Sequence, residues 1–159
     1  MPSVMGKIID ELHKITPQII FVDGFSGGND DITQIIKKKK LGYVNLNNCS
    51  YHDLYHVLER SQIFISGRWH ASILCILANT PILLWGSDSH KTKSLYTILD
   101  YPYPFFEVST LPVNIEELTD TVKKIIGNQE LIKADIQAKS ILLSEKAIQN
   151  AKILSKYVN

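Results

Sequence analysis

From Gln62 to Trp85 the sequence reads QIFISGRWHASILCILANTPILLW, and this stretch decides the fold prediction. Short apolar runs at 62–66 and 81–85 predict two strands, and the run from Trp69 to Ala78 between them predicts a helix. We expect the strands to be parallel, because a helical crossover returns the chain to the edge of the sheet where it started. The cores of these strands, Ile63 to Ile65 and Ile82 to Leu84, and a third apolar run, Ile19 to Val22, do not alternate apolar with polar residues, which indicates burial on both faces.

The same alternation of strand and helix extends through the rest of the chain. Further strands are predicted at 19–22, 43–46 and 105–108. The expected fold class is therefore α/β, a Rossmann-like three-layer parallel sheet of about five strands with helices on both faces. Other helices are predicted at 3–15, from Asp30 or Asp31 to Lys40, from Ser50 onward, at 90–99, at 114–126 and, as an unusually long final helix, from about Gln129 to Val158.

Composition supports one globular domain spanning residues 1–159. Hydrophobic residues make up 45% of the chain and charged residues 21%, and no linker or repeat divides it. With 17 basic and 16 acidic residues the net charge is +1, so we expect no nucleic-acid partner. No apolar run is long enough to span a bilayer, and the first residues do not follow a signal-peptide layout. We therefore expect a cytoplasmic protein without a transmembrane segment.

The turn after the strand at 62–66 is the strongest candidate for a functional site. Ligands of open parallel sheets bind outside the carboxyl ends of the strands, where Ser66, Gly67, Arg68 and His70 lie. The amides at the start of the following helix favour an anion, and the guanidinium of Arg68 suits phosphate or carboxylate. His70 can donate or accept a proton near neutral pH. In the alternative interpretation, Arg68 pairs with an acid and His70 caps a backbone carbonyl.

The turn after the next strand, at 86–93, adds further cations to the same edge. Lys91 and Lys93 begin a helix, where positive charge opposes the helix dipole, and this cost favours contact with an anionic ligand. His90, Ser87 and Ser89 accompany them, and the alternative is a solvated helix start.

Other motifs carry weaker signals. The glycines at 24–28 match no dinucleotide or P-loop pattern and favour a turn before a helix cap. The lysines at 37–40 favour a solvated helix end. His52 and His56 have helical i, i+4 spacing but no third ligand, so no metal site is predicted. Cys49 and Cys75 make no disulfide framework, and Cys75 is expected to be a buried thiol.

Over residues 20–126 the chain resembles the polysaccharide pyruvyl transferase family. The residues that carry the resemblance are FISGRWHASIL at 64–74, TPILLWG at 80–86 and HKTK at 90–93. The resemblance implies a GT-B-like fold, of which this chain would be the C-terminal half. It also implies transfer of a pyruvyl group from phosphoenolpyruvate to a saccharide hydroxyl in the synthesis of cell-surface polysaccharide.

The resemblance assigns roles to individual residues. Arg68 would hold the phosphate or the carboxylate of phosphoenolpyruvate, and His70 would be the catalytic general acid. Ser66, Gly67, Lys91 and Lys93 would be further substrate-binding residues. It implies no cofactor and no metal.

Family members are about twice as long, so the resemblance implies that an N-terminal acceptor half is absent. A partner chain or a second copy would then complete the cleft. Two alternatives stay open from the residues alone. One is a GT-B glycosyltransferase domain that binds a nucleotide sugar, and the other is a domain that binds an anion or saccharide without catalysis. Whether the chain is an enzyme is therefore open at this stage.

Overall fold

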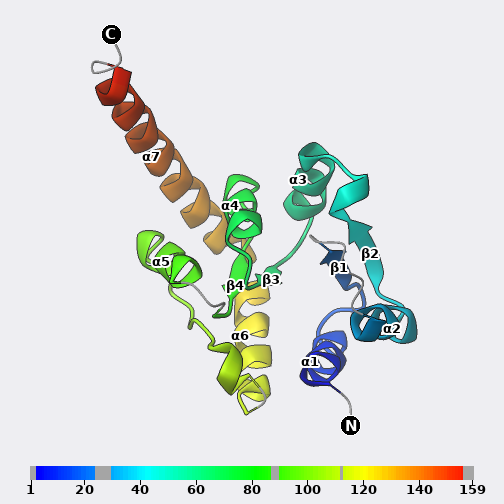
Figure 1. Ribbon diagram of the computed structural model, residues 1–159. Helices are drawn as coiled ribbons and strands as arrows, with labels where there is room; N and C mark the ends of the chain where they lie inside the picture. The colour runs from blue at the N-terminus through cyan, green and yellow to red at the C-terminus, as the bar shows by residue number, and fades with distance from the viewer. Residues whose placement is uncertain (1–2, 24–29, 87–89, 112, 156–159) are drawn as a thin grey trace.

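The computed structural model describes residues 3–23, 30–86, 90–111 and 113–155, without the side chains of 30–32 and 154–155. Helices predominate in this part of the chain (Figure 1). The α-helices are α1 (Val4–His13), α2 (Asp30–Lys39), α3 (Tyr51–Glu59), α4 (Trp69–Leu77), α5 (Lys91–Ile98), α6 (Ile115–Gly127) and α7 (Gln129–Ser155). The strands are β1 (Ile20–Asp23), β2 (Gly42–Asn45), β3 (Phe64–Ser66) and β4 (Ile82–Leu84), and the short 3-10 helices are η1 (Leu46–Asn48) and η2 (Val108–Thr110).

The strands form two separate pairs. β1 pairs with β2 and β3 pairs with β4, both in parallel, as expected for strands joined by helical crossovers. In the described residues the two pairs make no common sheet, and they lie apart in Figure 1. The predicted five-stranded, three-layer Rossmann-like sheet is therefore wrong, and so is the GT-B-like half-fold that depends on it.

The sheet ends at β4 because tyrosine hydroxyls occupy its outer edge. The backbone N–H of Ile82 donates to Tyr101 Oη at 3.1 Å, and that of Leu84 donates to Tyr96 Oη at 2.8 Å. These amides would otherwise pair with the run predicted as a strand at 105–108. That run is reduced to one parallel bridge, between Trp85 and Phe106.

Burial also differs between the two strand pairs. All three residues of β4 are fully buried, as predicted from their apolar run. In β3, by contrast, Phe64 to Ser66 are only half-buried, and in β1 Ile20 is 50% exposed, so burial on both faces is wrong for these two strands. The β1–β2 pair is therefore peripheral, and β4 is the strand around which the core is built.

One hydrophobic core joins the helices to β4. α4 contacts α3, α5 and α7, and α1 packs against α6. Cys75 of α4 lies fully inside this core, which confirms the predicted buried thiol, and burial raises the pKa of that thiol. The other core side chains include Ile8, Leu12, Leu54, Leu58, Ile76, Leu95, Leu99, Phe106, Leu118, Val122, Ile125, Ile132 and Ile136.

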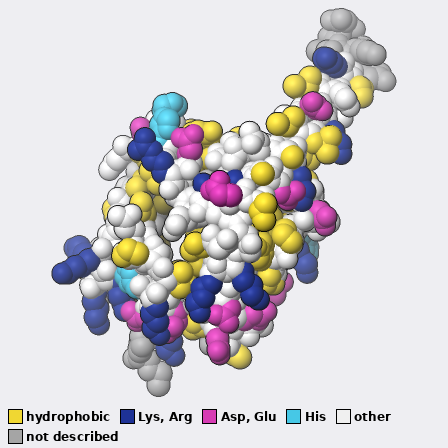
Figure 2. All heavy atoms as spheres, turned by 180° about the vertical axis from the view of Figure 1, so that it is seen from behind, with side chains coloured by type: hydrophobic (Ala, Val, Ile, Leu, Met, Phe, Trp, Pro, Cys, Tyr) yellow, Lys and Arg dark blue, Asp and Glu magenta, His cyan; other side chains and the backbone are white. Residues whose placement is uncertain are grey.

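The predicted long C-terminal helix is confirmed as α7, with 27 residues. Ile132 and Ile136 bury its first turns in the core. Ile141 and Ile148 are more than half exposed, and the later turns project from the body, with hydrophobic and charged side chains on their surface (Figure 2). In the described residues, no helix combines the length and the apolar character that crossing a membrane requires.

The tyrosine contacts predict a specific loss of stability. Tyr96→Phe removes the acceptor of the Leu84 amide and leaves that buried N–H without a partner. An unsatisfied buried donor costs about 1–3 kcal/mol, so the free energy of unfolding should fall by that amount in urea denaturation. The matched control is Tyr51→Phe, since Tyr51 is 80% exposed. Equal stability of the two variants would contradict this explanation of the sheet edge.

The same tyrosines predict alkaline sensitivity. Burial raises the pKa of the Tyr96 and Tyr101 hydroxyls, and the hydrogen bonds from the amides only partly offset it. Above a pH of about 10 the unfolded chain loses these protons while the folded chain keeps them, so stability falls as pH rises. Urea denaturation between neutral and alkaline pH should show this slope, and it should be shallower in Tyr96→Phe. An unchanged slope in that variant would argue against the assignment.

Candidate anion site at the carboxyl ends of β3 and β4

The carboxyl ends of β3 and β4 lie side by side, and each strand is followed by a helix. Ser66, the last residue of β3, is in register with Leu84, the last residue of β4. The chain enters α4 at Trp69 and α5 at Lys91, and these two helices are in contact. The two turns therefore leave the same edge of the strand pair, but residues 87–89 of the second turn lie outside the described part of the chain, so contact between the turns stays a prediction.

The β3–α4 turn is held by its own polar groups and by Trp85. The Arg68 amide donates to Ser66 Oγ at 3.0 Å, and the Ser72 hydroxyl donates to the Arg68 carbonyl at 2.7 Å. A Cβ on Gly67 would lie 2.8 Å from Trp85 Cδ1, so only glycine leaves room for the indole. The indole of Trp85 thus packs directly on the turn, which sequence reasoning did not anticipate.

In the described residues, neither helix has an N-cap residue whose side chain caps it. Arg68 and His90 occupy the N-cap positions of α4 and α5, and neither side chain caps its helix. Ser72 and Ser94 donate their backbone N–H groups to the carbonyls of Arg68 and His90. Among the described residues, the amides of 69–71 and 91–93 have no acceptor in the helical hydrogen-bond ladders, as is usual for the first turn of a helix.

The charges at these helix starts oppose the helix dipole. The described first turns of α4 and α5 contain no acidic residue. In α3, α6 and α7, acidic residues occupy the first turn, as the dipole favours. Instead, exposed Arg68 and His70 stand at the start of α4, and exposed Lys91 and Lys93 at the start of α5. A bound anion would offset this unfavourable arrangement.

The predicted site residues lie in the β3–α4 turn and in the first turns of α4 and α5. Ser66 and Gly67 build the turn, and Arg68, His70, Lys91 and Lys93 surround the two helix starts. Of these, His70, Lys91 and Lys93 form no side-chain hydrogen bond or ion pair with any described residue. Ser87 and Ser89, and the glycines at 24–28, lie outside the described residues.

Glu107 is a further charged residue at this edge that sequence reasoning missed. Its Oε2 atom lies 2.5 Å from the place that a Cβ on Gly86 would occupy, next to Trp85. The only signal in the sequence was a charged residue in an apolar run, Phe105 to Val108. A carboxylate in this position can accept a proton from a hydroxyl group.

The other candidate motifs do not form sites. The rings of His52 and His56 are 4.3 Å apart, and His56 Nδ1 lies 3.4 Å from Glu59 Oε2. No group of three or more metal-ligating residues is present in the part of the chain that the structure describes. In the lysine run, Lys39 pairs with Asp10 and lowers the pKa of that carboxyl, while Lys37, Lys38 and Lys40 are exposed.

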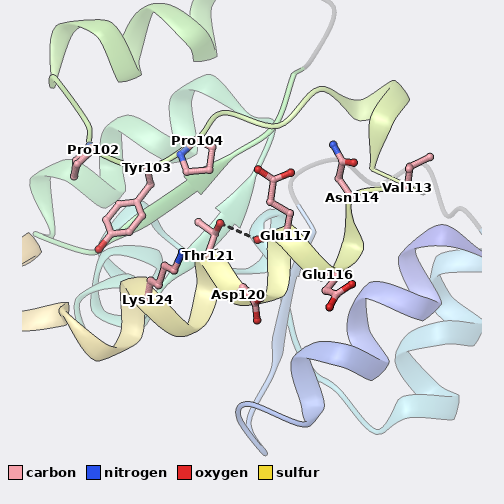
Figure 3. A pocket seen from close by; sticks show the side chains of 10 residues that line it. All are labelled: Pro102, Tyr103, Pro104, Val113, Asn114, Glu116, Glu117, Asp120, Thr121 and Lys124. Carbon is pink, nitrogen blue, oxygen red and sulfur yellow. Dashed lines mark hydrogen bonds between the residues drawn. The ribbon is translucent and has the colours of Figure 1, made fainter.

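A separate pocket of about 620 Å³ lies between α6 and residues 102–104 (Figure 3). Glu117, Thr121 and Lys124 line it from α6, and Tyr103 and Pro104 line it from the opposite side. It contains none of the predicted site residues. Its carboxylates, from Glu116, Glu117 and Asp120, make it unsuited to an anion.

The contact between Gly67 and Trp85 can be tested by substitution. Gly67→Ala should push the indole off the turn, change the tryptophan fluorescence and lower the free energy of unfolding by about 1–3 kcal/mol. The matched control is Gly127→Ala at the end of α6, where an added Cβ meets nothing within 4 Å. That variant should gain stability from reduced backbone entropy in the unfolded chain. The packing argument is wrong if both variants change stability in the same direction.

Comparison with known proteins does not identify this chain. No family model, no curated protein and no solved structure matches it.

Proposed function

We propose that this chain binds phosphoenolpyruvate between the starts of α4 and α5 and acts in pyruvyl transfer to a saccharide hydroxyl. The observation that carries the proposal is a pair of parallel strands with adjacent carboxyl ends, each followed by a helix whose first turn carries cations and whose described N-cap residue makes no side-chain cap. The resemblance of residues 64–74, 80–86 and 90–93 to the polysaccharide pyruvyl transferase family supports the choice of ligand.

The ligand and the site are complementary in charge. Phosphoenolpyruvate carries a phosphate and a carboxylate on the same carbon, so it needs donors for two anionic groups. Arg68 and the amides of 69–71 supply one set, and Lys91, Lys93 and the amides of 91–93 supply the other. The guanidinium of Arg68 can hold either group with two parallel hydrogen bonds.

The residues at this edge also supply acid and base groups for the transfer. In the proposed reaction His70 donates a proton to the methylene carbon of the enol, and an acceptor hydroxyl oxygen adds to the central carbon. A second hydroxyl displaces the phosphate from the same carbon and closes the ketal. One of the two hydroxyl protons replaces the proton that His70 gave, and the other protonates the departing phosphate. In this proposal Glu107, whose carboxylate lies beside Gly86, accepts one of them.

A nucleotide sugar is the second candidate ligand. Its diphosphate would fit the same two helix N-termini, and the half-buried indole of Trp85 offers a surface for stacking against a sugar or base. The same site without catalysis would bind either anion and turn neither over. Binding measurements with both ligands separate these possibilities.

The test is isothermal titration calorimetry with phosphoenolpyruvate. The wild-type chain should bind, and Arg68→Ala should weaken binding about tenfold or more, since hydrogen bonds to charged groups are worth about 1.5–3 kcal/mol. The matched control is Arg60→Ala, because Arg60 is the other arginine of the chain and is exposed at the end of α3. This control should bind like wild type.

The outcome decides between the candidate functions. No binding of phosphoenolpyruvate at millimolar concentration would refute the proposal. Binding of a nucleotide sugar instead would favour glycosyl transfer. If phosphoenolpyruvate binds, release of inorganic phosphate in the presence of a saccharide acceptor, abolished in His70→Ala, would establish the transfer.

A further inference from the structure

Thr92, in the first turn of α5, has a buried side-chain hydroxyl without a hydrogen-bond partner among the described residues. Its side chain is fully buried, and Oγ1 has no hydrogen-bond partner among the described residues. The buried threonines elsewhere behave differently, because their hydroxyls donate to backbone carbonyls: Thr80 to Leu58, Thr119 to Glu116 and Thr121 to Glu117. An unpaired buried hydroxyl is costly, so Thr92 needs an explanation.

The position of Thr92 follows from Tyr96, one turn later on the same face of α5. Tyr96 Oη accepts the amide of Leu84, which places this face of the helix on β4. Tyr101, further along the chain, accepts the amide of Ile82, so the chain runs back along β4 from its carboxyl end. One turn before Tyr96, Thr92 therefore lies at the carboxyl end of β4, at the same edge as the candidate anion site.

We propose that the Thr92 hydroxyl is a specificity-determining donor for the second anionic group of the ligand. This inference rests on the proposed function. One group of phosphoenolpyruvate lies at the start of α4 with Arg68, and one oxygen of the other group accepts hydrogen bonds from Thr92 Oγ1 and the first amides of α5. Because Thr92 is shielded from water, its hydrogen bond to a charged oxygen is stronger than one at the surface. The site therefore selects small anions with two charged groups over those with one.

The experiment compares Thr92→Val, Thr92→Ser and the matched control Thr97→Val, which removes an exposed hydroxyl from the other end of α5. Valine has nearly the shape of threonine, so the variant without ligand should be at least as stable as wild type in urea denaturation. In calorimetry, Thr92→Val should bind phosphoenolpyruvate about tenfold more weakly than wild type. Thr92→Ser and Thr97→Val should bind it within about threefold of wild type.

Inorganic phosphate is the second probe, because it carries a single anionic group. Its affinity should change less than threefold in Thr92→Val and should fall in Arg68→Ala. Equal losses for phosphate and phosphoenolpyruvate in Thr92→Val would overturn the assignment of two separate subsites.

The failure of this inference is distinct from that of the proposed function. If Arg68→Ala loses phosphoenolpyruvate binding and Thr92→Val does not, the anion site stands and the role of Thr92 is refuted. If Thr92→Val is less stable without ligand and Thr92→Ser does not restore binding, the role of Thr92 is structural and the inference is also refuted. If the wild-type chain binds neither probe, both proposals fail.

Discussion

Two tyrosine hydroxyls on the edge of β4 are the contacts on which the rest of the structure depends. Tyr96 and Tyr101 accept the amides of Leu84 and Ile82, which in a larger sheet would be bonded to another strand. A buried amide needs an acceptor, and here the acceptors come from α5 and the segment after it. The contacts therefore end the sheet and fix α5 against β4 at the same time.

The position of α5 decides the geometry of the candidate site. Tyr96 ties α5 to Leu84, and α5 also contacts α4. The carboxyl ends of β3 and β4 are adjacent because the two strands pair in parallel, so a five-stranded sheet is not required to bring them together. The same few contacts thus hold the core and position α5, whose first turn carries Lys91, Lys93 and the unbonded hydroxyl of Thr92.

The local sequence pattern predicted the positions of the strands better than it predicted how the strands pair. Strands were expected at 19–22, 43–46, 62–66 and 81–85, and the structure has β1 to β4 at closely corresponding positions. The run at 105–108 has the composition of a strand, but only Phe106 forms a bridge, to Trp85 directly after β4. The composition of a segment indicates how well it suits an extended strand. Whether the segment pairs with β4 depends on which hydrogen-bond acceptors lie next to the β4 amides. Nothing in the spacing of Tyr96 and Tyr101 reveals that their hydroxyls would do so.

For the candidate site, the sequence by itself determined the residue types and their order along the chain. Ser66, Gly67, Arg68 and His70 follow one strand, and Lys91 and Lys93 follow the next, so parallel pairing places them at one edge. Only the tertiary structure decided that Trp85 packs on Gly67, that Glu107 lies beside Gly86 and that Thr92 is buried without a partner. The physical reason is that strand direction follows from local connectivity, whereas contact and desolvation depend on segments that are distant in the chain.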